Sequence, residues 1–161
     1  MLAICTISDY TVTEGDFMNN IFECIRKYNN LTAEMEMIYH KAALKMGLTD
    51  STSEILYVLS YNSGALALSD ICRLSALTRQ TVNSSIRKME EEGLIYLDAI
   101  DGKSKKVCLT EKGKEYTKNT VDKIIKIENE ICENWDDEEI VKYVELTEKF
   151  VKSLDEKVKK L

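Results

Sequence analysis

The complete absence of proline is the feature that most constrains the fold of this chain. None of the 161 residues is proline, so no helix has to be interrupted by a residue that lacks a backbone N–H. Long helices are therefore favoured. The chain is also 44% hydrophobic and 31% charged, which supports a packed core rather than a disordered chain. We expect one domain with helical extensions.

Apolar spacing predicts long helices at both ends of the chain. Residues 17–46 repeat apolar side chains at helical intervals, as one helix or two in tandem, and Gly47 supplies a stop. A further helix follows Thr110 and runs to about Cys132. The last helix carries a heptad-like stripe of Ile140, Val144, Thr147, Val151, Leu154, Val158 and Leu161. Such a stripe has to be buried, within the same chain or, as we expect, in a dimer.

The middle of the chain predicts three shorter helices. A capping box at residues 51–54 opens the first, and residues 62–64 end it. Ser69 is the expected cap of the second helix. After a turn at residues 75–77, Thr78 caps the third, which runs to about Glu92 before Gly93 stops it.

The third of these helices has a narrow apolar stripe and an unusual polar surface. Val82, Ile86 and Met89 form the stripe. The candidate DNA-contacting residues on its other faces are Thr78, Arg79, Gln80, Thr81, Asn83, Ser84 and Arg87. Guanidinium and amide groups can pair with base edges, and hydroxyls can hold phosphates. For this helix alone, an ordinary solvated face is an equal alternative.

Two short strands follow directly, at residues 94–97 and 106–109. The turn signal Asp101–Gly102 joins them as a hairpin, with Lys103, Lys105 and Lys106 at or beside its tip. A helix, a turn, a polar second helix and a basic hairpin constitute a winged helix, which places the second helix in the DNA major groove. The hairpin is then positioned to meet phosphates or the minor groove.

The charge distribution removes an objection to this interpretation. A net charge of −6 argues at first against a nucleic-acid partner. However, residues 70–114 contain nine Lys/Arg and seven Asp/Glu, a net charge of +2, whereas the remainder carries −8. The basic groups therefore cluster where a DNA-facing module needs them.

The order of these motifs resembles the MarR family of winged-helix transcription regulators. The most diagnostic part is Met89-Glu90-Glu91-Glu92-Gly93-Leu94-Ile95 followed by Leu109-Thr110-Glu111-Lys112-Gly113. With the terminal helices, the similarity covers residues 17–160. The family's wing usually carries Asp-x-Arg, whereas this chain has Asp101-Gly102-Lys103, which keeps the charge and loses the bidentate guanidinium.

The residues and the resemblance together give a fold class and a function. We expect a mainly α protein with a small β-hairpin wing, divided into an N-terminal arm and dimerisation helix (1–48), a winged helix-turn-helix domain (49–113) and C-terminal dimerisation helices (114–161). The resemblance implies a homodimeric regulator, expected to be a repressor, that binds a pseudo-palindromic operator in double-stranded DNA. A winged-helix protein-interaction module without strong DNA binding is the alternative. Whether residues 1–15 form an arm that reaches a partner is left open.

The resemblance also implies a signal, either a small-molecule effector or cysteine oxidation. The side chains that could line an effector pocket are Tyr28, Met35, Tyr39, His40, Tyr57 and Tyr61. For each of them, a core or surface role is favoured over contact with a ligand. Cys24 is the candidate for oxidation because it lies in the first helix, near the expected dimer interface.

Other chemistries lack support in the sequence. The five cysteines form no C-x-x-C pair, and His40 is the only histidine, so a disulfide framework or a metal site is not expected. No nucleotide-binding or hydrolase motif occurs. We therefore expect no enzyme activity and no cofactor. No segment approaches a membrane span and the N-terminus has no basic-then-apolar pattern, so we expect a cytoplasmic protein.

Overall fold

The computed structural model describes residues 6–7, 10–11, 17–99 and 105–161. The predicted turn at Asp101–Gly102, Lys103 and most of residues 1–15 lie outside the described residues. The chain divides into two compact units, Met1–Asp50 and Ser51–Leu161. Each unit is described by itself below.

The first unit is dominated by one long helix. Helix α1 spans Phe17–Lys45 without interruption, which settles the choice between one helix and two. Gly47 follows the last turn of the helix, and its φ of +71° allows the Leu48 amide to donate to the Ala43 carbonyl at 2.9 Å. Strands β1 (Thr6–Ile7) and β2 (Tyr10–Thr11) pair antiparallel, a hairpin that the sequence did not predict.

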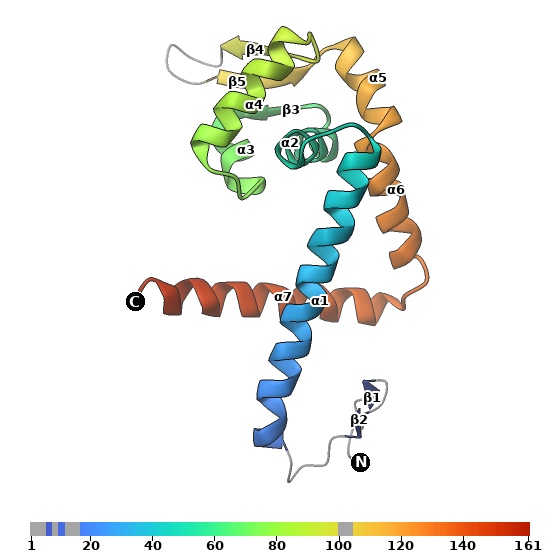
Figure 1. Ribbon diagram of the computed structural model, residues 1–161, viewed down its shortest axis with the longest axis vertical. Helices are drawn as coiled ribbons and strands as arrows, with labels where there is room; N and C mark the ends of the chain where they lie inside the picture. Colours follow the sequence, from blue (N-terminus) through green and yellow to red (C-terminus); the bar gives the residue numbers. More distant parts are fainter. Residues whose placement is uncertain (1–5, 8–9, 12–16, 100–104) are drawn as a thin grey trace. The chain divides into compact units, whose positions relative to one another are not determined.

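The second unit is a helical domain around a small sheet. Its elements are α2 (Asp50–Tyr61), β3 (Ala65–Ala67), α3 (Leu68–Leu74), α4 (Arg79–Glu91), β4 (Ile95–Ala99), β5 (Lys105–Leu109), α5 (Glu111–Asn119), α6 (Val121–Cys132) and α7 (Asp137–Val158). The antiparallel sheet has the strand order β3-β5-β4. Figure 1 shows α4 lying beside β4 and β5, with α3 near the other end of α4. The expected winged-helix fold is therefore confirmed.

The core of this unit lies where three helices meet one face of the sheet. Its fully buried side chains include Ile55, Leu56 and Leu59 of α2, Ile71 of α3, Val82 and Met89 of α4, and Ile95 and Val107 of the sheet. The predicted apolar stripe of α4 is thus confirmed as the buried face of that helix.

Two predicted helix caps are wrong. Helix α3 begins at Leu68 after an extended Ala67 that makes no side-chain cap bond, so Ser69 lies inside the first turn. Helix α2 begins at Asp50, so Ser51 is also a helical residue. In α3 the N-cap position is Ala67, so Ser69 lies two residues after the cap, and in α2 the helix begins one residue before Ser51.

Two further details of the fold differ from the prediction. Strand β3 was missed because three residues give no alternation to detect, and its ladder forms only with β5. The helix expected after Thr110 divides at Thr120, where φ is −125° and ψ is −102°. The Thr120 hydroxyl donates to the Tyr116 carbonyl at 2.7 Å, a local bond that accompanies the break.

Candidate nucleic-acid interface

The start of α4 is fixed by a tight turn and a cap. Ala76 adopts a left-handed conformation with a φ of 53°, and the Leu77 amide donates to Ser75 Oγ at 3.4 Å. Thr78 Oγ1 then accepts from the Thr81 amide at 3.2 Å. The predicted N-cap is therefore confirmed, and it leaves the N-terminus of α4 exposed, where the helix dipole favours anions.

The inner face of α4 is anchored to the core, which fixes the direction of its outer face. Val82, Ser85, Ile86 and Met89 are buried. Ser85 Oγ donates to Ser51 Oγ of α2 at 3.0 Å, so the one polar group on this face has a partner. The helix cannot rotate about its axis without exposing this stripe to water.

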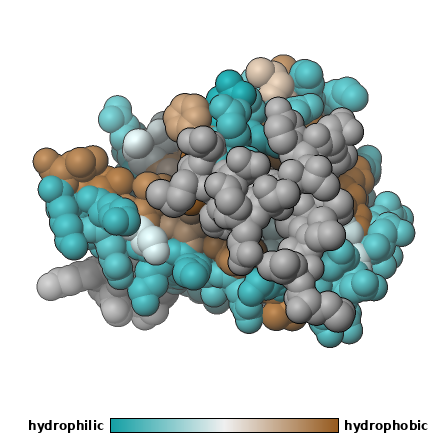
Figure 2. Space-filling view, turned by 90° about the horizontal axis from the view of Figure 1, so that it is seen from below, coloured by the Kyte–Doolittle hydropathy of each residue, from teal (hydrophilic) through white to brown (hydrophobic). Residues whose placement is uncertain are grey.

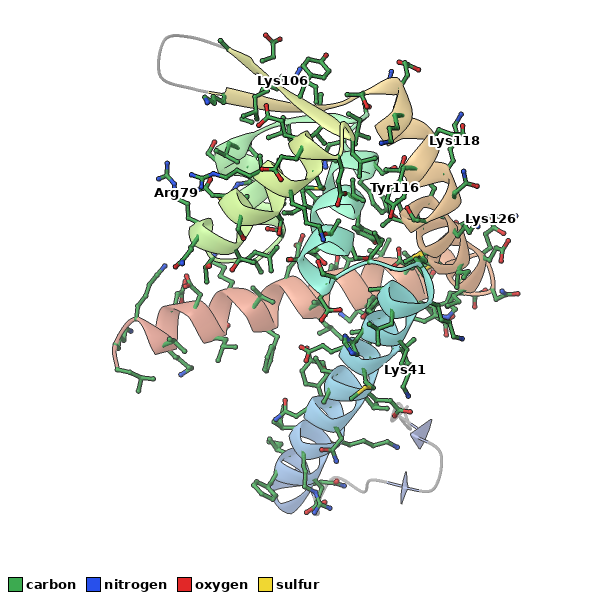
Figure 3. The ribbon with its side chains drawn as sticks, turned by 45° about the horizontal axis from the view of Figure 1, so that its top comes forward. Lys41, Arg79, Lys106, Tyr116, Lys118 and Lys126 are labelled. Atoms are coloured by element: carbon green, nitrogen blue, oxygen red, sulfur yellow. The ribbon has the colours of Figure 1, made fainter. Side chains whose placement is uncertain are left out.

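The outer face of α4 carries two kinds of predicted contact residue. Arg79 and Arg87 are exposed and form no ion pair with any described residue. Gln80 is exposed, Asn83 is half-buried, and neither side chain bonds to another described residue. These four groups are available to a ligand, and Figure 3 shows Arg79 extending outward from the helix.

The hydroxyls of the same helix are already used locally. The Oγ1 atoms of Thr78 and Thr81 lie 2.8 Å apart, within hydrogen-bonding distance. Ser84 Oγ donates to the Thr81 carbonyl at 3.0 Å. A hydroxyl accepts as well as donates, so these groups can still contact a phosphate, but with less freedom than the amides and guanidinium groups.

Charge along α4 is uneven. Its first turn contains no acidic residue, and its acidic groups begin only at Glu90. Near the other end, Lys88 Nζ lies 4.0 Å from Glu92, and Lys112 Nζ donates to the Glu92 carbonyl at 2.6 Å. Of the two arginines without an ion pair among the described residues, Arg79 therefore lies at the positive N-terminus of the helix and Arg87 about two turns further on.

The wing presents its lysines on two different faces. Residues on a strand alternate in direction. Lys105 shares a face with the buried Val107 and Leu109, whereas Lys106 lies on the other face, directly across from Asp98. Lys105 is exposed and Lys106 is half-buried. Lys105 and Lys106, which are neighbours in the predicted basic cluster, therefore lie on opposite faces of the wing. Lys106 is labelled in Figure 3.

The diagnostic motif pair proves to be the attachment of the wing to α5. The Thr110 amide donates to the Leu94 carbonyl at 3.0 Å, and its hydroxyl donates to the Gly93 carbonyl at 2.7 Å. The Gly113 amide donates in turn to Thr110 Oγ1 at 3.0 Å. A Cβ on Gly113 would lie 2.0 Å from the Leu94 oxygen, so this position needs glycine for space.

The side chains proposed for an effector pocket fall in both units. Tyr28, Met35, Tyr39 and His40 belong to α1 and are exposed, and His40 Nδ1 lies 2.9 Å from Asp50 Oδ1. Tyr57 and Tyr61 belong to α2, where their ring centroids are 5.1 Å apart. The pocket remains a prediction.

A polar contact between α2 and α6 was missed by the sequence analysis. Tyr57 Oη donates to Glu128 Oε2 at 2.6 Å, and Ser60 Oγ donates to Asp122 Oδ1 at 2.5 Å. Burial and this hydrogen bond raise the pKa of Tyr57. Burial and the neighbouring Glu128 charge raise the pKa of Glu54. The polar Tyr57 and Ser60, three residues apart among the apolar residues that end α2, were the available signal.

The cysteines differ in exposure. Cys24 is exposed, and its Sγ lies 3.8 Å from Asn20 Oδ1. Cys108 is buried, and Cys72 and Cys132 are half-buried. Cys5 lies outside the described residues, and the role of Cys24 remains a prediction. Among the described residues no group of three His, Cys, Asp or Glu side chains could hold a metal ion, and no helix is long and apolar enough to cross a bilayer.

Helices α1 and α7 expose broad apolar surface. No residue of α7 is buried, and Val144, Val151 and Leu154 are each about half exposed, at 49%, 58% and 50%. On α1, Leu31 and Ile38 are 54% and 58% exposed. Brown apolar surface is visible among hydrophilic side chains in Figure 2. These stripes have the helical spacing of interface residues.

Comparison with known proteins confirms the resemblance. The model of the MarR family matches residues 46–103. AbsC, a MarR family regulator from Streptomyces coelicolor, is 17% identical, with a TM-score of 0.67 over 91% of this chain and 98% of that one. The S. aureus MepR–DNA complex is 21% identical, with a TM-score of 0.61 over 80% and 96% of the two chains.

A third solved structure concerns regulation. Bordetella bronchiseptica BpsR is 21% identical, with a TM-score of 0.57 over 78% of this chain and 98% of that one. Its description concerns regulation of DNA binding by 6-hydroxynicotinic acid. A search of curated proteins found none that matches the chain.

Proposed function

We propose that this chain, whose residues 46–103 match the model of the MarR family, is a dimeric, sequence-specific DNA-binding regulator of transcription that acts as a repressor. The observation that carries the proposal is the outer face of α4. Its inner face is locked into the core, and its exposed face offers Arg79, Gln80, Asn83 and Arg87 without partners among the described residues. The MepR relative, which has the same fold, was solved with DNA.

Each side chain on α4 has a role that its chemistry suits. Arg79 and Arg87 can pair with guanine O6 and N7, and Gln80 and Asn83 with adenine N6 and N7. Thr78, Thr81 and Ser84 are suited to phosphate oxygens, which position the helix without reading sequence. The basic wing adds phosphate contact beside the groove.

The dimer is inferred from the exposed apolar stripes of α1 and α7. A second copy would remove these side chains from water, at about 25 cal/mol per Å² of apolar surface buried. A two-fold axis would set two α4 helices about 34 Å apart, which matches successive major grooves on one face of DNA. The operator would then be pseudo-palindromic.

Regulation by a small molecule is the preferred form of control, and oxidation of Cys24 is the alternative. The aromatic side chains Tyr28, Tyr39, Tyr57 and Tyr61 suit an aromatic effector, with His40 as a polar anchor. BpsR, which shares the fold, is described with a hydroxylated aromatic acid as the regulator of its DNA binding.

The DNA contact is tested with fluorescently labelled duplexes that the wild-type protein enriches from a random pool. Fluorescence anisotropy should show tight binding that weakens steeply with salt. The double variant Arg79→Ala/Asn83→Ala should lose at least about 100-fold in affinity, since each good base contact contributes about 1–3 kcal/mol. Lys126→Ala, which removes an exposed lysine of α6 paired with Glu130 at 3.5 Å, is the matched control and should bind as wild type.

Failure to bind any duplex at low salt would overturn the DNA-binding function and favour a protein-interaction module. The dimer is tested separately by sedimentation of Val151→Glu/Leu154→Glu. Both positions are about half exposed in the single chain, so the variant should fold. It should sediment as a monomer, and a variant that stays dimeric would exclude α7 from the interface.

A further inference from the structure

The two lysines of strand β5, Lys105 and Lys106, differ in their surroundings, and under the proposed function this difference determines which of them contacts DNA. The register of the strands distinguishes the two residues. Lys105 pairs with Ala99 of β4, and Lys106 pairs with Asp98. Because side chains alternate along a strand, the two lysines emerge from opposite faces of the ribbon.

The face that carries Lys105 is the inner face of the sheet. Val107 and Leu109 of β5 and Ile95 of β4 share this face and are buried. In register with Val107 lie Leu66 on one side and Leu97 on the other. This apolar face is buried, so it is the one that packs toward the helices, and α4 contacts β4.

Lys105 occupies the end of that inner face. Strand β3 stops in register with Lys106, so the sheet has narrowed to two strands at Lys105. Its cross-strand neighbour Ala99 is exposed, small and uncharged. Lys105 is therefore an exposed cation on the α4 side of the wing, just beyond the core, with no opposing charge across the strand.

Lys106 lies in different surroundings. Its two cross-strand neighbours on the outer face are Ala67 of β3 and Asp98 of β4. Residues directly across a strand pair have Cβ atoms about 5 Å apart, so an acidic residue neighbours Lys106, although the two side chains form no ion pair within 4.0 Å in the described part of the chain. Lys106 is also half-buried, which limits its reach.

We propose that Lys105 makes the wing's phosphate contact from the stem of the hairpin, on the face shared with α4, and that Lys106, half-buried on the opposite face, does not. DNA that holds the outer side of α4 in its major groove runs beside the α4 face of the wing. A phosphate there meets the uncompensated charge of Lys105 first. Lys106 faces away from this path and contributes little to binding.

The test compares Lys105→Ala with Lys106→Ala on the enriched duplexes, measuring affinity between low and moderate salt. Each phosphate contact contributes about 0.9 to the slope of log K against log salt. Because a bound dimer carries two copies of Lys105, Lys105→Ala should lower the slope by about two and weaken all duplexes alike. Lys106→Ala should leave the slope unchanged. Lys106→Gln, which removes the charge but keeps most of the side-chain length, controls for a change in the structure of the ribbon.

The outcomes separate this inference from the proposed function. If the wild type binds but Lys106→Ala or Lys106→Gln lowers the salt slope, the assignment of the contact to Lys105 is wrong and the proposed function still stands. The same conclusion follows if Lys105→Ala leaves the slope unchanged. Absence of salt-dependent binding by the wild type would overturn both. Thermal melts test whether each variant is as stable as the wild type, so that a smaller salt slope can be assigned to a lost phosphate contact rather than to unfolding.

Discussion

Replacing Gly113 with alanine puts a methyl group where the first turn of α5 touches the start of β4. The new Cβ would lie 2.0 Å from the Leu94 carbonyl oxygen and 3.2 Å from Leu109 Cδ2. The nearest neighbour is backbone, which cannot rotate out of the way. The helix has to move away from the strand by about 1.4 Å before this contact reaches the 3.4 Å at which ordinary van der Waals contact begins.

The size of the effect follows from the bonds at this contact. Alanine in a helix is ordinarily better than glycine by about 0.5–1 kcal/mol. Here the retreat strains the bond from the Thr110 amide to the Leu94 carbonyl, which is 3.0 Å long. A lost hydrogen bond costs about 1 kcal/mol, and overpacking costs about 1–3 kcal/mol. We expect Gly113→Ala to lower the free energy of unfolding by about 2–3 kcal/mol.

The measurement is urea unfolding followed by circular dichroism at fixed protein concentration. Gly47 provides the matched control, because its φ is +71° and a Cβ added there would meet no atom within 4 Å beyond its chain neighbours. Asparagine tolerates this conformation, so Gly47→Asn should cost well under about 1 kcal/mol. Gly113→Asn should be as harmful as Gly113→Ala. A neutral or stabilising Gly113→Ala would refute the steric reason for this glycine.

Three further outcomes are expected from substitutions in and around the helix-turn-helix. Thr78→Ala should lower the free energy of unfolding by about 1 kcal/mol through loss of the cap bond, measured by urea unfolding. Ala76→Gly should raise it by up to about 1 kcal/mol, since the residue has a φ of 53°, and a loss of stability would contradict this. Burial raises the pKa of Glu54, so its charged form is disfavoured in the fold. Glu54→Gln should therefore stabilise at pH 7, and this gain should shrink as the pH falls and the carboxyl becomes protonated; a gain independent of pH would contradict the raised pKa.

The sequence predicted the elements whose signals are local. The apolar stripe of α4, its Thr78 cap and the stop at Gly47 were all readable, since each depends on a few neighbouring residues. The long α1 and the two strands of the wing were predicted on the same basis. Ser69 failed as a cap because its pattern is common inside helices as well as before them.

The features that the sequence missed depend on segments far apart in the chain. Strand β3 exists only because β5 pairs with it. The hydrogen bond between Tyr57 and Glu128 joins residues 71 positions apart. The division of the wing lysines needed the register of β4 on β5, which spacing alone did not give because a slip of one residue exchanges the two faces.

Selection of bound sequences from random duplex DNA tests the central proposal most directly, because it reports binding, sequence preference and symmetry together. If two copies of α4 read DNA, the enriched sequences should contain two inverted half-sites with centres about one helical turn apart. Arg79→Ala/Asn83→Ala should fail to enrich them. Enrichment of a single unrepeated site would contradict the dimeric arrangement, and no enrichment at low salt would contradict DNA recognition by α4.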